Sequence, residues 1–171
     1  MVLSAYEKFC RGEKEAFTVV TEKFAKPLSL YAYKIVHRHD IAEDVMMDAL
    51  MELVVKKRRF TSQEHLTAFL YRIVRNKSID IVRKRKRLVP LEEAKELYLT
   101  YEEVKGRESS EKYKSAMANL PQAYREVLVL SFEEGLSAEE IAFVLKKSKK
   151  QVYNLLFRAK NAFQKFYGEI R

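Results

Sequence analysis

The segment at residues 120–167 constrains the fold more than any other part of the chain, because it carries closely spaced helix stop and start signals. Pro121 suits the first turn of a helix, and Gly135 suits the position just past a helix end. Residues 137–140 (SAEE) have the form of a capping box, and Ser148 can cap a further helix. The segment therefore predicts three helices, of which the last two form a helix-turn-helix.

The last helix of this segment carries side chains that suit DNA. A recognition helix enters the major groove with its N-terminal residues leading. Basic side chains can bind phosphate or guanine, and Asn or Gln can pair with adenine. The candidate DNA-binding residues are Lys149, Lys150, Gln151, Tyr153, Asn154, Phe157 and Arg158. The alternative is a surface lysine cluster on an ordinary helical hairpin.

The rest of the chain predicts an all-α protein. Only four glycines and three prolines occur in 171 residues, and apolar residues recur at helical spacing. Helices are expected over 13–25, 28–37, 41–59 and 62–87, with Pro27 separating the first two. Asp40 and Thr61 are expected to cap the third and fourth helices.

The composition argues against disulfides, metal sites and membrane spans. The single cysteine, Cys10, excludes an internal disulfide and a CxxC metal site. His37 and His39 have no further ligand nearby in sequence, so we expect helix-end histidines and neither a metal nor a cofactor. No apolar run approaches the roughly 20 residues that span a membrane. The N-terminus lacks a signal-peptide core, so we expect a cytoplasmic protein.

Charge is distributed in blocks. Residues 1–87 carry 19 basic and 11 acidic residues, residues 88–112 carry 4 and 7, and residues 113–171 carry 10 and 6. Two basic blocks separated by an acidic stretch indicate two modules that face nucleic acid, joined by a tether.

The fourth expected helix has an aromatic and basic face that ends in five consecutive cations at 83–87. Cations bind phosphate, and nearby aromatic side chains can stack on unpaired bases. A solvated basic tail is the usual alternative, but the interleaved aromatics favour single-stranded nucleic acid. On the third helix, Met47 and Met51 either form an adaptable protein contact or widen the core face.

Four motifs together resemble one family. They are GEKEAF at 12–17, DIAEDVMMDALMEL at 40–53, FLYRIVRNKSIDIVRKRKR at 69–87 and LPQAYREVLVLSFEEGLSAEEIA at 120–142. In order and separation they resemble the sigma factors of bacterial RNA polymerase, in the small extracytoplasmic-function class. Phe69 stands where a tryptophan is common in that class.

The resemblance implies two small helical domains, at 1–87 and 113–171, joined by a flexible acidic linker at 88–112. The first would bind core polymerase and the minus-ten promoter element, and the second the minus-thirty-five element. By position, the reading face of the second domain falls on Tyr153, Asn154, Phe157 and Arg158. The polymerase contacts fall on Asp44, Met47, Asp48 and Met51. The pocket for a flipped minus-ten base falls on Phe60, Ile73 and Asn76, and further minus-ten contacts are expected at Tyr71, Arg72, Arg75, Lys77 and Arg83.

The chain departs from the family pattern at three places. Met47 stands where a glutamine is common, so this contact is expected to be apolar. Tyr153 stands where a basic residue is frequent, which predicts an unusual promoter preference. Lys146 and Lys147 replace a glycine and an apolar residue in the turn, and a left-handed Lys146 would cost about 1–2 kcal/mol.

The expected function is that of a promoter-specificity subunit, which directs DNA melting and transcription initiation and is not itself an enzyme. Expected partners are core RNA polymerase, duplex and single-stranded promoter DNA, and an anti-sigma factor whose identity the sequence does not reveal. The free protein is expected to be monomeric, without membrane insertion. Three alternatives stay open: a helix-turn-helix regulator that acts without polymerase, an accessory factor that needs a second protein, and a DNA-processing enzyme, for which no carboxylate cluster or nucleophile–base pair is present.

Overall fold

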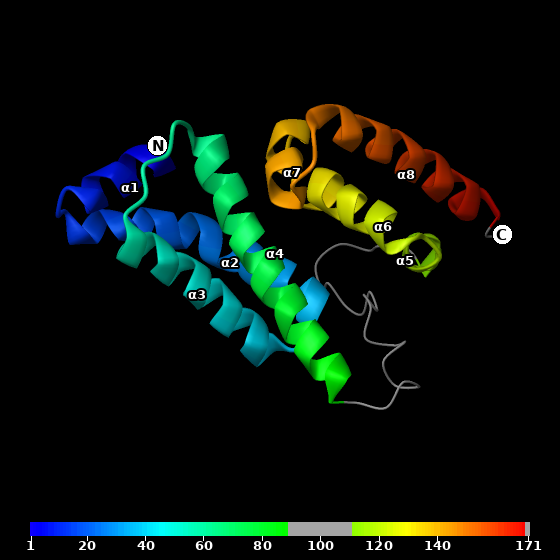
Figure 1. The fold of residues 1–171 in the computed structure, drawn as a ribbon, viewed down its shortest axis with the longest axis horizontal. Coiled ribbons are helices and arrows are strands. Elements are labelled where there is room, and N and C mark those ends of the chain that lie inside the picture. Colours follow the sequence, from blue (N-terminus) through cyan, green and yellow to red (C-terminus); the bar gives the residue numbers. More distant parts are fainter. Residues whose placement is uncertain (89–110, 170–171) are drawn as a thin grey trace. The chain divides into compact units, whose positions relative to one another are not determined.

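The computed structural model describes residues 1–88 and 111–169, and within these ranges it contains helices and no strands. The chain divides into two compact units, Met1–Leu88 and Val89–Arg171 (Figure 1). The predicted all-α class with two helical domains is confirmed. Most of the linker expected at 88–112 lies outside the described residues.

The first unit is built from α1 (Val2–Cys10), the short 3-10 turn η1 (Lys14–Ala16), α2 (Phe17–Val36), α3 (His39–Lys56) and α4 (Gln63–Arg87). Helices α2, α3 and α4 pack on one another, and α1 packs mainly on α2 and also contacts α4 (Figure 1). Each helix buries one apolar stripe, because its apolar residues recur every three or four positions. The stripes contribute Val20, Phe24, Leu28, Val45, Leu53, Leu66, Leu70 and Val74.

The expected break at Pro27 is wrong, because α2 runs through this residue without interruption. A proline inside a helix removes one backbone hydrogen bond and costs about 3 kcal/mol. Phe24 and Leu28 lie on either side of Pro27, and both are almost fully buried. Helix α2 packs against α3 and α4, and this burial offsets the local penalty, which is a tertiary effect that helix propensity does not contain.

Two expected helix caps are shifted by one or two residues. Helix α3 begins at His39, so Asp40 lies inside the first turn, where it accepts two hydrogen bonds from the Arg38 side chain at 3.1 and 2.5 Å. These hydrogen bonds hold the pKa of Asp40 below its ordinary value. Helix α4 is capped by Ser62 and not by Thr61, since the Ser62 hydroxyl accepts from the His65 amide at 3.1 Å.

Helix α1 has no counterpart among the helices expected from the sequence. Its Tyr6 is 1% exposed, and the Tyr6 hydroxyl donates to the Leu53 carbonyl of α3 at 3.3 Å. Burial raises the pKa of Tyr6. The ring also contacts Phe60, with centroids 5.6 Å apart, so α1 supports the loop that joins α3 to α4.

The second unit contains α5 (Glu111–Ala118), α6 (Gln122–Leu128), a π-helical turn η3 (Val129–Glu133), α7 (Ala138–Leu145) and α8 (Lys149–Glu169). The expected capping box is present, because the Ser137 hydroxyl accepts from the Glu140 amide and the Glu140 carboxylate accepts from the Ser137 amide. Gly135 has φ +70°, as expected just past a helix end. The helix-turn-helix predicted from the sequence is therefore formed by α7 and α8.

The turn between α7 and α8 contains a left-handed lysine, Lys146, with φ 53°. In a left-handed backbone conformation the Cβ atom lies too close to the following carbonyl oxygen, and glycine has no Cβ atom. We therefore expect Lys146→Gly to raise the free energy of unfolding by about 1 kcal/mol. Thermal unfolding measures this directly. Lys147→Gly is the matched control, since Lys147 does not have a positive φ; it should give no gain, because glycine there only adds freedom to the unfolded chain. A lower melting temperature for Lys146→Gly would contradict the expectation.

Candidate functional site

One face of α3 is exposed at each of the four positions expected to contact polymerase. Asp44, Met47, Asp48 and Met51 lie three or four residues apart, and all four are exposed. Met47 is 51% exposed and Met51 is 49% exposed. Of the two alternatives for these methionines, the structure therefore excludes the core face.

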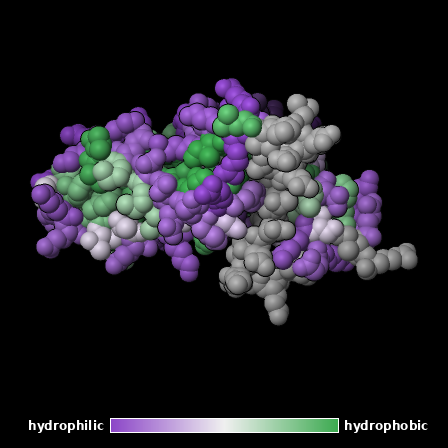
Figure 2. Space-filling view, turned by 90° about the horizontal axis from the view of Figure 1, so that it is seen from below, coloured by the Kyte–Doolittle hydropathy of each residue, from purple (hydrophilic) through white to green (hydrophobic). Residues whose placement is uncertain are grey.

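Val55 extends this face by one turn and was not among the expected residues. It is 74% exposed and lies four positions after Met51 on the same helix. An apolar, β-branched residue such as Val55 is ordinarily expected in the core. Its spacing from Met47 and Met51 could nevertheless have indicated that it shares their face. Figure 2 views the molecule from the side on which α3 lies in Figure 1, and apolar patches interrupt the mostly hydrophilic surface there.

The residues expected to hold a flipped base lie at and beyond an aromatic cluster. The half-buried Phe60 ring lies 5.2 Å from Phe69 of α4, with the Phe60 and Tyr6 rings also in contact. Ile73 and Asn76 follow Phe69 by four and seven residues, which places them on the same stripe of α4. Ile73 is half-buried and Asn76 is exposed. The structure thus arranges an aromatic, an apolar and an amide side chain in succession along one stripe.

A cation beside this cluster was missed in the sequence. The Arg58 guanidinium lies over the Phe69 ring, 5.1 Å from its centroid. Arg58 belongs to the loop between α3 and α4, and no helical periodicity extends into a loop. Its proximity to Phe69 depends on the tertiary fold.

The expectation that Tyr71 lies on the exposed basic face of α4 is wrong. Tyr71 is 4% exposed, and its ring packs against Tyr31 of α2 with centroids 5.1 Å apart. Tyr71 shares its side of α4 with Val74 and Ser78, which are also buried. Because α4 packs on two neighbouring helices, its buried stripe is wider than a single row of apolar residues indicates.

Three of the basic residues expected at the minus-ten surface, Arg72, Arg75 and Lys77, are half-buried. The Lys77 ammonium lies 3.4 Å from the Asp48 carboxylate of α3, and both side chains are partly exposed. An exposed pair of this kind contributes little to stability. It does place a candidate DNA contact directly beside a candidate polymerase contact.

The basic run at the end of α4 has a mixed role. Arg83 is 68% exposed and lies 3.9 Å from Asp80 of the preceding turn. Arg85 instead donates to the Val36 carbonyl at 3.3 Å, near the C-terminal end of α2. Part of the run therefore stabilises the fold, because an arginine can satisfy a carbonyl that has no partner at a helix end.

The outward face of α8 carries all seven residues expected to contact the minus-thirty-five element, and each is exposed. Val152 and Ala159 are buried on the opposite side. Helical spacing separates the exposed residues into two flanks. Tyr153 and Phe157 form an aromatic flank, and they are 56% and 68% exposed. Gln151, Asn154 and Arg158 form a polar flank.

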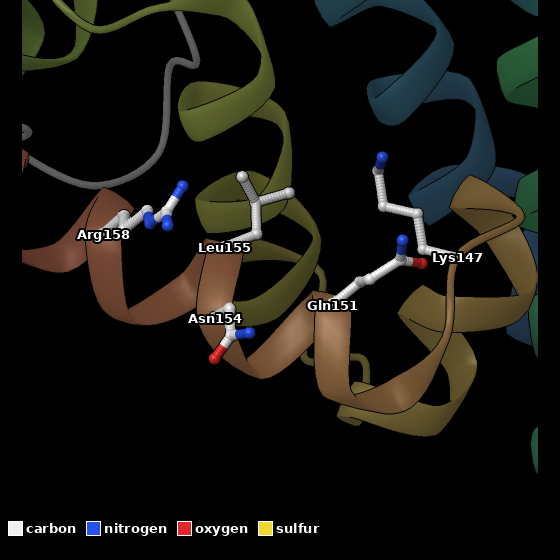
Figure 3. Close-up of a pocket in the computed structure, with 5 residues that line it drawn as sticks. All are labelled: Lys147, Gln151, Asn154, Leu155 and Arg158. Carbon is white, nitrogen blue, oxygen red and sulfur yellow. The ribbon is translucent and has the colours of Figure 1, made fainter.

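The polar flank borders a shallow groove of about 230 Å³ (Figure 3). The groove is lined by Lys147, Gln151, Asn154, Leu155 and Arg158. Among these, Gln151 closes a second reciprocal cap. The Gln151 side-chain oxygen accepts from the Ser148 backbone N–H at 2.8 Å, and the Gln151 backbone N–H donates to the Ser148 hydroxyl at 3.1 Å. The expected cap at Ser148 is thus present, with Gln151 as its second member.

An exposed aromatic residue that precedes the helix-turn-helix was also missed. Phe132 lies in the π-helical turn η3 and is 63% exposed, with the Lys160 ammonium 5.2 Å from its ring centroid. A π-helical turn changes the direction of the side chains relative to an α-helix. An α-helical pattern in the sequence therefore cannot locate Phe132.

No group of three or more His, Cys, Asp or Glu side chains within residues 1–88 and 111–169 could hold a metal ion. None of the helices described is long and apolar enough to span a membrane.

Two family models match the chain, one in each unit. Residues 21–88 match the model described as Sigma-70 region 2, and residues 110–163 match the model described as Sigma-70, region 4. The chain belongs to the sigma-70 family of RNA polymerase sigma factors. The resemblance drawn from the four motifs is confirmed, and this sigma factor is of the extracytoplasmic-function class.

Curated relatives of this sigma factor agree with that assignment. It is 25% identical to the ECF RNA polymerase sigma factor SigW of Bacillus subtilis, over 96% of each chain. It is 28% identical to the RNA polymerase sigma factor SigZ of the same organism, over 71% of this chain and 69% of the relative. It is 27% identical to the RNA polymerase sigma-H factor of Pseudomonas aeruginosa, over 93% and 90%.

Solved structures share the fold of this sigma factor. The sigma factor RpoE of Bartonella quintana, in complex with the anti-sigma factor NepR, matches with a TM-score of 0.67 and 24% identity, over 91% of this chain and 98% of that one. CnrH, in complex with the cytosolic domain of CnrY, matches with a TM-score of 0.66 and 22% identity, over 99% and 98%. At these identities the likeness concerns the fold alone.

Proposed function

We propose that this sigma factor binds core RNA polymerase through α3 and contacts promoter DNA through α4 and α8. The observation that carries the proposal is the outward orientation of the predicted contact residues on α3 and α8, while the opposite sides of both helices form the core. Catalysis would belong to the polymerase. The sigma factor would supply promoter recognition and would assist DNA opening.

The α3 face is suited to a protein partner. Met47, Met51 and Val55 expose a continuous apolar row, and Asp44 and Asp48 border it. Flexible methionines adapt to a partner surface, and flanking carboxylates select for a partner of positive charge. We propose that this face is the docking surface for core polymerase.

The α4 stripe, together with Phe60 of the preceding loop, is suited to an unpaired base. Phe60 can stack on a base, Ile73 can contact its apolar edge, and the Asn76 amide can donate to and accept from its pairing edge. Within the described residues, the Asn76 side chain forms no hydrogen bond that would occupy this amide. Opening the duplex costs a few kcal/mol per step, and capture of the extruded base offsets part of that cost.

Run-off transcription with purified core polymerase and a genomic promoter library tests the proposal. Specific transcripts should require both the polymerase and this protein, and their start sites should share an upstream and a downstream element. A helix-turn-helix regulator would instead bind duplex sites tightly without polymerase and would start no transcripts. Transcription that needs a further protein would favour the accessory-factor alternative.

Arg158→Ala and Asn154→Ala should each weaken binding to the minus-thirty-five duplex by about 1–3 kcal/mol, because each can contact a base edge. Titration of the recovered duplex and of base-substituted versions measures both affinity and base preference. Lys149→Ala should instead weaken all duplexes alike and reduce the salt slope by about 0.9, as expected for one phosphate contact. If all three substitutions act equally on every duplex, the division between base reading and phosphate binding is incorrect.

A further inference from the structure

The side chain of Gln151 is already used by the fold in a way that limits what it can read. A backbone N–H can only donate, so the side-chain atom that faces the Ser148 amide at 2.8 Å is the amide oxygen of Gln151. The cap therefore determines which end of this amide points where. In Figure 3 the oxygen is turned toward the turn that precedes α8, and the nitrogen is turned toward the groove.

This orientation matters because a glutamine reads adenine by donating one hydrogen bond and accepting another. The cap uses one lone pair of the Gln151 oxygen and holds this oxygen at the turn, so a capped Gln151 presents its two N–H donors, and not its acceptor, to the groove. Asn154 differs, since within the described part of the chain its amide forms no hydrogen bond. Two neighbouring amides on one flank of α8 thus have different recognition chemistry.

Apart from Asn154, the other polar groups of the groove have the same character as the capped Gln151. Lys147 supplies an ammonium and Arg158 supplies a guanidinium, and neither group can accept a hydrogen bond. Leu155 adds an apolar wall. A groove lined in this way fits a hydrogen-bond acceptor.

We infer that the backbone N–H of Ser148 makes the Gln151 side chain a donor-only contact, which binds an acceptor atom on DNA and does not read adenine by a paired donor and acceptor. The acceptor is the O6 or N7 atom of guanine, the O4 atom of thymine, or a phosphate oxygen. Adenine also has an N7 acceptor, but its neighbouring N6 amino group is a donor that a donor-only amide cannot satisfy. The inference rests on the proposed function of α8 as the reading helix. It assigns to Gln151 two roles, closing the cap at the start of α8 and selecting the base or phosphate beside it.

The other capping box in the chain shows which variants separate these roles. There the Glu140 carboxylate, which has no donors, accepts from the Ser137 amide at 2.6 Å, and the Glu140 backbone N–H donates to the Ser137 hydroxyl at 3.2 Å. Gln151→Glu should therefore retain the cap and lose the donors. At position 148, Ser148→Ala retains the backbone N–H that holds the Gln151 oxygen, whereas Ser148→Pro removes it.

The test is a selection with the full-length protein bound to core polymerase, from promoter duplexes whose minus-thirty-five region is randomised. The parent and Ser148→Ala should select the same bases, with adenine disfavoured at the position that depends on Gln151. Ser148→Pro frees the Gln151 oxygen. In this variant the enrichment of adenine at that position should rise by about 5- to 150-fold relative to the parent. Circular dichroism checks that the Pro variant keeps its helices. Selection of adenine by the parent, lost in Gln151→Ala, would overturn the inference, and so would identical selection by folded Ser148→Pro and Ser148→Ala.

The Gln151→Glu variant keeps the inference testable even if Ser148→Pro does not fold. Gln151→Glu should have the same melting temperature as the parent, but its affinity for the selected duplex should fall by at least about fivefold. A loss confined to one base identifies a base acceptor. A loss equal for all sequences, which disappears when one phosphate is replaced by a neutral methylphosphonate, identifies a phosphate acceptor. Unchanged affinity of Gln151→Glu for every duplex would overturn the inference. A parent holoenzyme that selects no upstream sequence would overturn the proposed function as well.

Discussion

The double substitution Asp48→Lys and Met51→Lys should weaken binding to core RNA polymerase by about 2–4 kcal/mol, or about 30- to 1000-fold in Kd. Met51 would lose apolar contact area at the proposed interface, and two lysines would bring positive charge to a surface that is suited to a positive partner. Titration of the fluorescently labelled protein with purified core polymerase measures the change.

The matched control is the pair Val19→Lys and Glu22→Lys on α2. These residues have the same spacing of three, and they are likewise exposed, with Val19 at 44%. The control should leave core affinity within about twofold, since surface substitutions away from a binding site have small effects. Both proteins should keep the helical content of the parent, because the Asp48–Lys77 pair is exposed and contributes little to stability. An equal loss for both pairs, or no loss for the α3 pair, would contradict the docking assignment.

Asn76→Ala should lower open-complex formation on a double-stranded promoter by about 1–3 kcal/mol, or about 5- to 150-fold, if Asn76 reads the edge of an extruded base. Binding to core polymerase and to the upstream duplex should be nearly unchanged, because Asn76 lies on neither proposed surface. Permanganate reactivity of unpaired thymines reports the opening directly.

A template whose minus-ten region is already unpaired separates melting from base capture. This template should recover only part of the loss in Asn76→Ala, because melting no longer costs free energy while the base contact is still absent. Full opening of double-stranded promoters by Asn76→Ala, at limiting protein concentration, would place the pocket elsewhere on the protein. A repressor that binds only paired DNA would have no use for Asn76 in this way.

Local signals in the sequence were reliable where one residue type and one spacing were sufficient. The capping box at Ser137, the cap at Ser148 and the turn at Gly135 each depend on interactions within a few residues. The left-handed conformation considered for Lys146 is also present, at the residue that ends α7. The exposure of the α8 reading face follows from helical periodicity.

Signals whose outcome depends on neighbouring helices were not reliable. Pro27 indicated a helix break and Tyr71 indicated an exposed aromatic residue, yet neither expectation holds, because packing against neighbouring helices exceeds a local preference of about 3 kcal/mol. Asp40 indicated a cap, but the helix begins at His39 and Asp40 pairs with Arg38. Phe132 and Arg58 were missed because a π-helical turn and a loop have no α-helical period.

The sequence by itself determined the all-α class, the family and the helix-turn-helix, because these depend on periodicity, caps and the order of motifs along the chain. Only the tertiary structure decided which residues of α3 and α4 are available to a partner. It exposes Met47 and Met51, buries Tyr71, and commits Arg85 to the Val36 carbonyl. The physical reason is that burial depends on how many neighbours pack against a helix. A sequence specifies that number only through the whole fold.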